Sequence, residues 1–186
     1  MAAAAPSRPL AGDGVLDPVA VVALVVLWAN DHLGKAAAAG TAWAPLTGKL
    51  SDVAGLVLLP VLVVAAGEVW ADRRRRASRL PWGGPDPRLA LVAAVLVMVT
   101  FAAMKTTTWA GQAYALTLGA LQWPAHAVLA LVRGEAGLPP WRPVQHVVDP
   151  SDLVALPGAW YVVRQARCRA RSWASSGPTK AANDAR

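Results

Sequence analysis

Five long apolar runs most constrain what this chain can fold into. They centre on residues 17–30, 51–70, 89–104, 113–132 and 147–163. A transmembrane helix needs about 20 predominantly apolar residues. With 55% hydrophobic and 16% charged residues among 186, the chain has more apolar surface than a soluble core of this size requires. A membrane barrel would alternate polar and apolar residues, and residues 89–99 show no alternation. The sequence therefore predicts an all-α, polytopic helical membrane protein.

Arginine clusters indicate which side of the membrane each connection occupies. The net charge of +7 comes largely from Arg73–Arg76 with its neighbours and from arginines at 164–171. Both clusters flank apolar runs, where the positive-inside rule places cytoplasmic residues. We therefore expect the lipid bilayer as partner, with anionic headgroups at the Arg73–Arg76 loop and at the basic tail, and no nucleic acid. The expected location is the bacterial cytoplasmic (inner) membrane.

The last two apolar runs decide the number of crossings. Pro124 interrupts the 113–132 run, which favours a segment that turns back. If that run re-enters, 13 Lys and Arg lie inside and 5 outside, whereas five simple spans give 9 on each side. We predict four transmembrane helices plus one re-entrant or interfacial hairpin, with both termini cytoplasmic. Five simple spans remain the alternative.

The domain organisation follows from the same runs. Residues 1–14 are rich in Ala, Pro and Gly and predict a disordered N-terminal lead. The transmembrane domain is expected over 15–164. A basic cytoplasmic tail, disordered at its end, is expected over 165–186. The first apolar run is either an uncleaved first span, which charges at Asp31 and Lys35 favour, or a cleaved signal peptide.

Two Ser-Asp pairs precede apolar runs about a hundred residues apart. Ser51-Asp52 follows Trp43-x-Pro45, and Ser151-Asp152 follows Trp141-x-Pro143. Proline-broken backbone at membrane depth is tolerated where it lines a cavity or is buried in protein. We therefore predict a repeated half-site that brings the Asp52 and Asp152 carboxylates within about 8–10 Å. The alternative is that both segments only cap helices, with Ser51 or Asp149 as the N-cap.

The predicted topology gathers many ionisable groups at the outer face. They are Asp31, His32, Lys35, Lys49, Asp52, Lys105, His146, Asp149 and Asp152. Charge within a bilayer is costly, so such a collection predicts an intramembrane polar pocket. The candidate catalytic residues are Asp52 and Asp152, supported by Asp31, His32, Lys49 and Asp149. No spacing matches a metal signature, and no metal or cofactor is expected.

Three classes of function fit such a pocket. A membrane-embedded hydrolase, the hypothesis that we favour, would share one proton between Asp52 and Asp152. A proton or cation binding or transport accessory protein would use the same carboxylates, with Lys49 or Lys105 as counter-charge. A structural or assembly factor would use the aspartates as caps and as polar contacts between helices. The substrate and the oligomeric state stay open, and so does the choice between enzyme and non-enzyme.

Residues 47–56 read Thr-Gly-Lys-Leu-Ser-Asp-Val-Ala-Gly-Leu. This stretch resembles one found in an uncharacterised family of bacterial integral membrane proteins, and the resemblance implies no known activity. The plan of four spans with two outer-face aspartates is also similar to lipoprotein signal peptidase. That family carries Asn-x-x-Asp-Arg and Asn-x-Ala-Asp elements. Here no Arg follows Asp52 and no Asn precedes Asp152, so the likeness does not carry the peptidase activity to this chain.

Overall fold

The computed structural model describes residues 9–175, and all regular structure in this range is helical. The elements in chain order are η1 (Asp13–Leu16), α1 (Pro18–Ala29), η2 (Asn30–Gly34), α2 (Lys35–Ala38), α3 (Ala44–Ala77), α4 (Pro87–Thr106), α5 (Thr108–Val132), η3 (Pro150–Trp160) and α6 (Tyr161–Ser175). Within the described range, four helical stretches are long and apolar enough to cross a membrane: Pro18–Ala38, Ala44–Ala77, Pro87–Thr106 and Thr108–Val132. The chain is an all-α helical membrane protein, as predicted.

The chain divides into two compact units. Unit 1 comprises Met1–Met98 with Ala155–Arg186, and unit 2 comprises Val99–Val154. Unit 1 therefore contains α1, α3 and α6 together with the first part of α4. Unit 2 contains the last turns of α4, all of α5 and the segment that follows α5.

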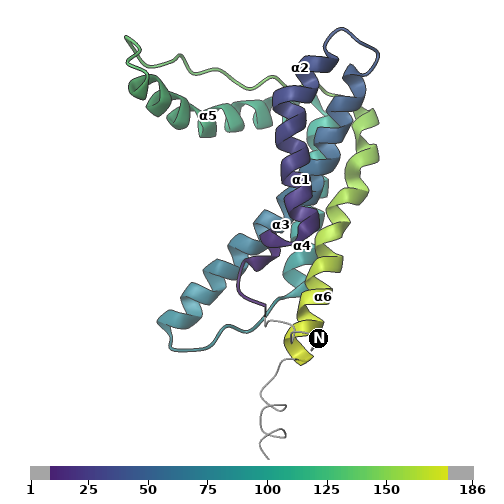
Figure 1. Ribbon diagram of the computed structural model, residues 1–186, viewed down its shortest axis with the longest axis vertical. Coiled ribbons are helices and arrows are strands. Elements are labelled where there is room, and N and C mark those ends of the chain that lie inside the picture. Colours follow the sequence, from purple (N-terminus) through teal and green to yellow (C-terminus); the bar gives the residue numbers. More distant parts are fainter. Residues whose placement is uncertain (1–8, 176–186) are drawn as a thin grey trace, which may run out of the picture. The chain divides into compact units, whose positions relative to one another are not determined.

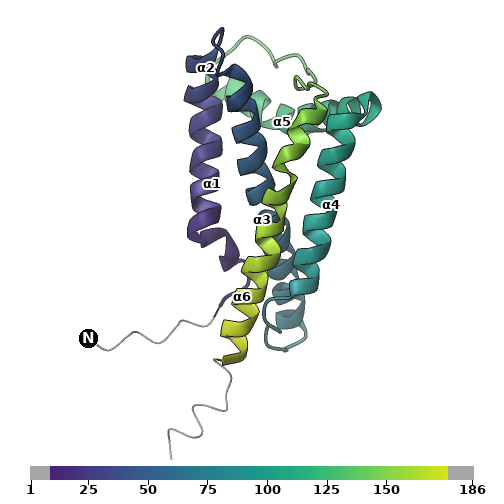
Figure 2. The same ribbon diagram turned by 90° about the vertical axis from the view of Figure 1, so that its right-hand side faces the viewer.

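Unit 1 is built on α1 and α3, which lie side by side, with α6 packed against α3 (Figures 1 and 2). Asp17 begins α1 by accepting a hydrogen bond from the backbone N–H of Val19, and Pro18 occupies the first turn. The core consists mainly of small residues: Ala20, Val61, Val64, Ala90, Ala93, Ala94, Val162, Val163 and Ala166. Small side chains allow helix backbones to approach closely, which is the usual packing of membrane helices.

Large apolar side chains of unit 1 point away from this core. Val22 on α1, Leu59 on α3 and Leu96 on α4 are 59%, 50% and 60% exposed. A soluble helix would bury such residues and expose polar ones. Small residues inside and large apolar residues outside match a protein whose outer surface contacts lipid.

Unit 2 has the form of a hairpin made from one helix and one extended segment. α5 ends at Val132, and Gly134 follows with φ +69°, a conformation that glycine adopts without strain. The chain then runs back along α5 (Figure 1). The backbone N–H of Val144 donates to the Ala115 carbonyl over 3.1 Å, and the Trp123 indole donates to the Pro139 carbonyl over 2.9 Å.

Small residues on α5 make room for this returning segment. Gly111, Ala115 and Gly119 are all buried and share one face of α5. A Cβ atom built at Gly119 would lie 2.5 Å from the carbonyl oxygen of Arg142. Glycine is therefore required at this position for the returning backbone to approach the helix.

The 113–132 run does not turn back within itself, contrary to the prediction. We expected the 113–132 run to turn back near Pro124, yet α5 continues through Pro124 and the chain reverses only after Val132. A proline removes one donor without necessarily ending a helix. The predicted fifth run, 147–163, forms η3 and the first turn of α6, and is not among the four long apolar helices.

The two predicted terminal regions also differ from expectation where they are described. Residues 9–14 of the expected disordered lead contain a turn and the start of η1, and the preceding residues lie outside the described range. The first part of the expected tail is helical, because α6 continues to Ser175. Residues 176–186 also lie outside the described range. The boundary predicted at residue 164 therefore falls inside a helix.

Candidate functional site

A charged pair stands at the end of α4 in unit 2. Lys105 Nζ lies 2.6 Å from Asp152 Oδ2, and the two side chains are 12% and 11% exposed. Lys105 occupies the last turn of α4, after a run with no charged residue since Arg88. An ammonium and a carboxylate this close and this buried stabilise each other strongly, because little water screens them.

The start of η3 positions Asp152. Asp149 Oδ1 accepts a hydrogen bond from the backbone N–H of Ser151 over 2.9 Å, and Pro150 is the first residue of η3. The backbone N–H of Asp152 donates to the Asp149 carbonyl over 3.1 Å. The predicted role of Asp149 as a helix cap is therefore confirmed.

His146 packs near the end of α4 in unit 2. Its Nε2 lies 2.8 Å from the Met104 carbonyl oxygen, and its ring meets the Tyr114 ring edge-on. A Cβ built at Gly111 would lie 2.6 Å from the His146 ring. The imidazole is thus packed between α5 and the end of α4, beside the residue that precedes Lys105.

In unit 1, the first Ser-Asp segment has a different role. The Asn30 side chain donates to the Thr47 carbonyl over 2.6 Å and to Ser51 Oγ over 2.7 Å. The Ser51 hydroxyl donates in turn to Asp31 Oδ1 over 2.7 Å. Lys35 Nζ completes the network at 2.7 Å from the same Asp31 oxygen, which confirms that these two residues share a helix face.

The alternative role predicted for Ser51, an N-cap, is wrong. α3 already begins at Ala44, with Pro45 in its first turn, so Ser51 lies about two turns inside the helix. Its hydroxyl joins α1 to α3 instead of ending a helix. No other atom lies within 4 Å of a Cβ built at Gly48, so this glycine is not required for a close backbone contact among the described residues.

The remaining predicted site residues have separate positions. Asp52 is half-buried on α3 and belongs to unit 1, whereas Asp152 belongs to unit 2. The predicted approach of their carboxylates stays a prediction. Lys49 is half-buried on α3, and His32 is exposed with its ring 5.4 Å from the Trp28 ring.

A second charged cluster, which the sequence did not predict, lies at the opposite end of α3. Arg169 on α6 donates to both carboxylate oxygens of Glu68, over 2.8 and 2.9 Å, and also to Asp13. Its Nη2 also donates to the Leu10 carbonyl over 3.0 Å, and the Glu68 carboxylate accepts from the Gly12 N–H over 2.9 Å.

The pKa of Arg169 is raised within this cluster. Burial of the guanidinium lowers the pKa, but the hydrogen bonds and charges of Glu68 and Asp13 outweigh burial. Glu68 is only 3% exposed, so a paired guanidinium is what makes its burial tolerable. The cluster is a structural connection between the N-terminal segment, α3 and α6.

The sequence indicates one member of this cluster, Glu68, but not its partner. Glu68 is a carboxylate within an apolar run, which marks it as paired. Its partner lies 101 positions away among several arginines of the tail. Helical periodicity places Arg169 on the face of Val162 and Ala166, with Arg167 and Arg171 on the other side, but no local pattern names Glu68 as its partner.

The chemistry available to the described residues is that of ion pairs and hydrogen bonds. Among residues 9–175, no group of three or more His, Cys, Asp or Glu side chains is arranged to hold a metal ion. Fold and site together define a small all-helical membrane protein with a buried Lys-Asp pair. The chain matches no family model, no curated protein and no solved structure.

Proposed function

We propose that this protein binds a proton or a monovalent cation at the Lys105–Asp152 pair, on the outer face of the bacterial cytoplasmic membrane. Both termini are cytoplasmic in this proposal.

The spacing of polar layers in unit 1 supports membrane placement. Ser51 and Glu68 lie about 26 Å apart along α3, at 1.5 Å rise per residue. This distance is close to the roughly 30 Å thickness of a hydrocarbon core. Asp52 aside, no charged residue lies between these two positions. The Asn30–Ser51–Asp31 network and the Glu68–Arg169 cluster would then mark the two membrane boundaries.

The returning segment of unit 2 supports an interfacial hairpin. Residues 135–149 form no helix, and they include Glu135 and Arg142. Unpaired backbone groups cannot be satisfied in lipid. If α5 crossed the membrane, the segment that runs back along it would also be drawn into the hydrocarbon core. An orientation at the outer interface avoids this cost.

The observation that carries the proposal is the buried pair itself. In the absence of a ligand, the Lys105 ammonium supplies the positive charge that the Asp152 carboxylate requires. A cation or proton that binds Asp152 replaces that charge, and the ammonium moves away toward water. One positive charge is exchanged for another, so the buried site never holds a carboxylate without a counter-charge.

The hydrolase hypothesis lacks a comparable observation. A carboxylate pair that shares a proton needs both carboxyl groups directed at one substrate. The partner at 2.6 Å from Asp152 is an ammonium. The contact therefore supports the cation-binding alternative, in which Lys105 serves as counter-charge.

The test compares the wild-type protein with the Lys105→Gln/Asp152→Asn double variant. Replacing both charges with amides avoids leaving one charge buried alone. Purified full-length protein in detergent is titrated with NaCl, KCl, choline chloride or acid, while thermal unfolding and proton uptake are measured.

We expect the wild-type midpoint to rise with one small cation beyond the choline control, or the wild-type protein to take up one proton more than the double variant on acidification. Equal responses of the two proteins would refute the proposal.

A structural or assembly role is the second candidate. The Asn30, Ser51 and Asp31 side chains are all engaged between α1 and α3. This network favours a role in holding helices together. Under the assembly hypothesis, Asp52→Asn and Asp152→Asn reduce the amount of folded protein in the membrane. Under the cation-binding hypothesis, Asp52→Asn and the Lys105→Gln/Asp152→Asn double variant both accumulate, and only the double variant loses the cation response.

A further inference from the structure

A cationic groove lies within unit 2, away from the Lys105–Asp152 pair. The groove encloses about 420 Å³ between α5 and the returning segment. Its polar lining comes from Gln122, His126, Arg133, Glu135 and Arg142. Two arginines against one glutamate give the groove a net positive charge, so it suits an anion of modest size.

Each arginine comes from a different side of the groove. Arg133 is the C-cap residue of α5, and Arg142 lies on the segment that runs back along α5. The carbonyl end of a helix disfavours anions. The guanidinium groups would therefore supply the attraction for an anion, and their planar donor sets suit the oxygens of a phosphate group.

The opposite face of α5 is apolar and uncovered within unit 2. Leu121, Val128 and Leu131 are 75%, 61% and 67% exposed. These residues share one side of the helix, away from the small residues that contact the returning segment. Such a face enters the acyl region of a bilayer, with the cationic groove at headgroup level.

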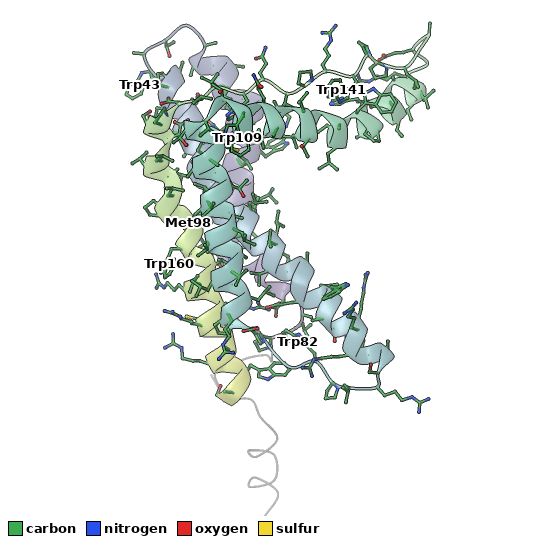
Figure 3. All side chains as sticks on the ribbon, turned by 180° about the vertical axis from the view of Figure 1, so that it is seen from behind. Trp43, Trp82, Met98, Trp109, Trp141 and Trp160 are labelled. Atoms are coloured by element: carbon green, nitrogen blue, oxygen red, sulfur yellow. The ribbon has the colours of Figure 1, made fainter. Side chains whose placement is uncertain are left out.

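Tryptophan side chains lie in and near the groove, as expected for a segment at the level of the lipid headgroups. Trp123 lines the groove and donates its indole N–H to the Pro139 carbonyl. Trp109 stands near the start of α5, and Trp141 on the returning segment (Figure 3). Both are exposed, at 70% and 45%. Tryptophan is enriched where a membrane meets water.

We propose that this groove binds the phosphate of an anionic phospholipid, held by Arg133 and Arg142 while the acyl chains lie against the apolar face of α5. The inference uses the membrane placement proposed above but not the cation exchange at Lys105 and Asp152. The acyl chains would provide most of the anchoring, and the arginines the selectivity for an anionic headgroup.

The experiment measures lipid binding to the full-length protein by native mass spectrometry. The protein in detergent is titrated with short-chain phosphatidylglycerol or phosphatidylcholine. The variants are Arg133→Gln/Arg142→Gln and, as a control with the same loss of charge outside the two arginine clusters, Lys35→Gln/Arg88→Gln. Both control positions are exposed and belong to unit 1.

We expect phosphatidylglycerol to bind wild-type protein more tightly than phosphatidylcholine, and the Arg133/Arg142 variant to bind it about tenfold more weakly. The control variant should keep most of the affinity. Equal losses in both variants would indicate unspecific surface charge and overturn the proposal, as would no loss in either.

A competition arm tests the lipid as the occupant. Glycerol phosphate at millimolar concentration should not displace phosphatidylglycerol, because it lacks acyl chains. Full displacement would assign the groove to a soluble phosphate ester and overturn the lipid proposal. The Lys105→Gln/Asp152→Asn variant should still bind phosphatidylglycerol. A failure of the cation-binding proposal would therefore not affect this result.

Discussion

The two Ser-Asp segments look alike in sequence and differ in structure. Ser51-Asp52 lies about two turns inside a long helix, where the serine hydroxyl joins α1 to α3. Ser151-Asp152 lies at the beginning of η3, where Asp149 caps the first turn and Asp152 pairs with Lys105. Ser51 makes a tertiary contact in the first segment, and Asp152 makes one in the second. The same dipeptide therefore serves two roles, set by where each helix begins.

The largest effect should come from removing the charge of the second segment. Asp152→Ala leaves the nearly buried Lys105 ammonium without the carboxylate at 2.6 Å. Breaking a buried pair on one side costs about 3–5 kcal/mol. We expect a loss of this size in the free energy of unfolding, measured by denaturant titration in mixed micelles. The Lys105→Gln/Asp152→Asn variant should recover at least half of it, and no recovery would argue against an ion pair.

The next largest effect is expected from substitutions of the residue that precedes each Ser-Asp pair. Leu50→Pro gives the first segment the proline of the second, but at an interior position of α3. Interior proline costs about 3 kcal/mol or more. Pro150→Ala removes a proline from the start of η3 and should cost less than about 1 kcal/mol. The two variants are compared by thermal unfolding. Equal losses of stability would contradict the claim that one proline position lies inside a helix and the other at its start.

A smaller effect is expected at the serine of the first segment. Ser51→Ala removes the hydroxyl that accepts from Asn30 and donates to Asp31. Leaving buried polar groups with fewer partners costs about 1–3 kcal/mol. Thr47→Ala is the matched control, because its exposed hydroxyl only contacts the Ala44 carbonyl within the same helix. The control should stay within about 0.5 kcal/mol of wild type in the same unfolding assay.

An effect smaller than that at Ser51 should come from the cap of the second segment. Asp149→Ala removes the acceptor for the Ser151 N–H and should cost about 1 kcal/mol. Asp149→Asn keeps a capping oxygen and should retain most of the stability. If the Asn variant were as unstable as the Ala variant, the charge of Asp149 would matter more than its role as a cap.

The helical membrane architecture could be predicted because it depends on composition. Apolar runs of the required length admit few alternatives, and the structure confirms helices over the first four. The re-entrant or interfacial hairpin stays a prediction, because the 113–132 run forms one continuous helix that is itself long and apolar enough to cross a membrane. The turn expected near Pro124 was wrong, because a helix can continue through proline and the chain reverses only at Gly134.

The candidate site was predictable only in part. Lys105 and Asp152 were each identified from their charge beside an apolar run, but their contact joins residues 47 positions apart. The role of Ser51 was missed because α3 begins at Ala44, earlier than the polar residues at 47–52 suggest. Asn30, the donor to Ser51, carries no charge and so gave no electrostatic signal.

The Glu68–Arg169 cluster has a consequence for the biogenesis of the protein. Asp13 and Glu68 leave the ribosome early, whereas Arg169 follows Asp13 by 156 positions. The Glu68 carboxylate, which is almost fully buried in the folded protein, therefore has no Arg169 partner in the nascent chain until α6 has been made. Unit 1 can close only when α6 arrives. A chain that stops before α6 would be expected to remain open at this end and to be recognised by membrane quality control.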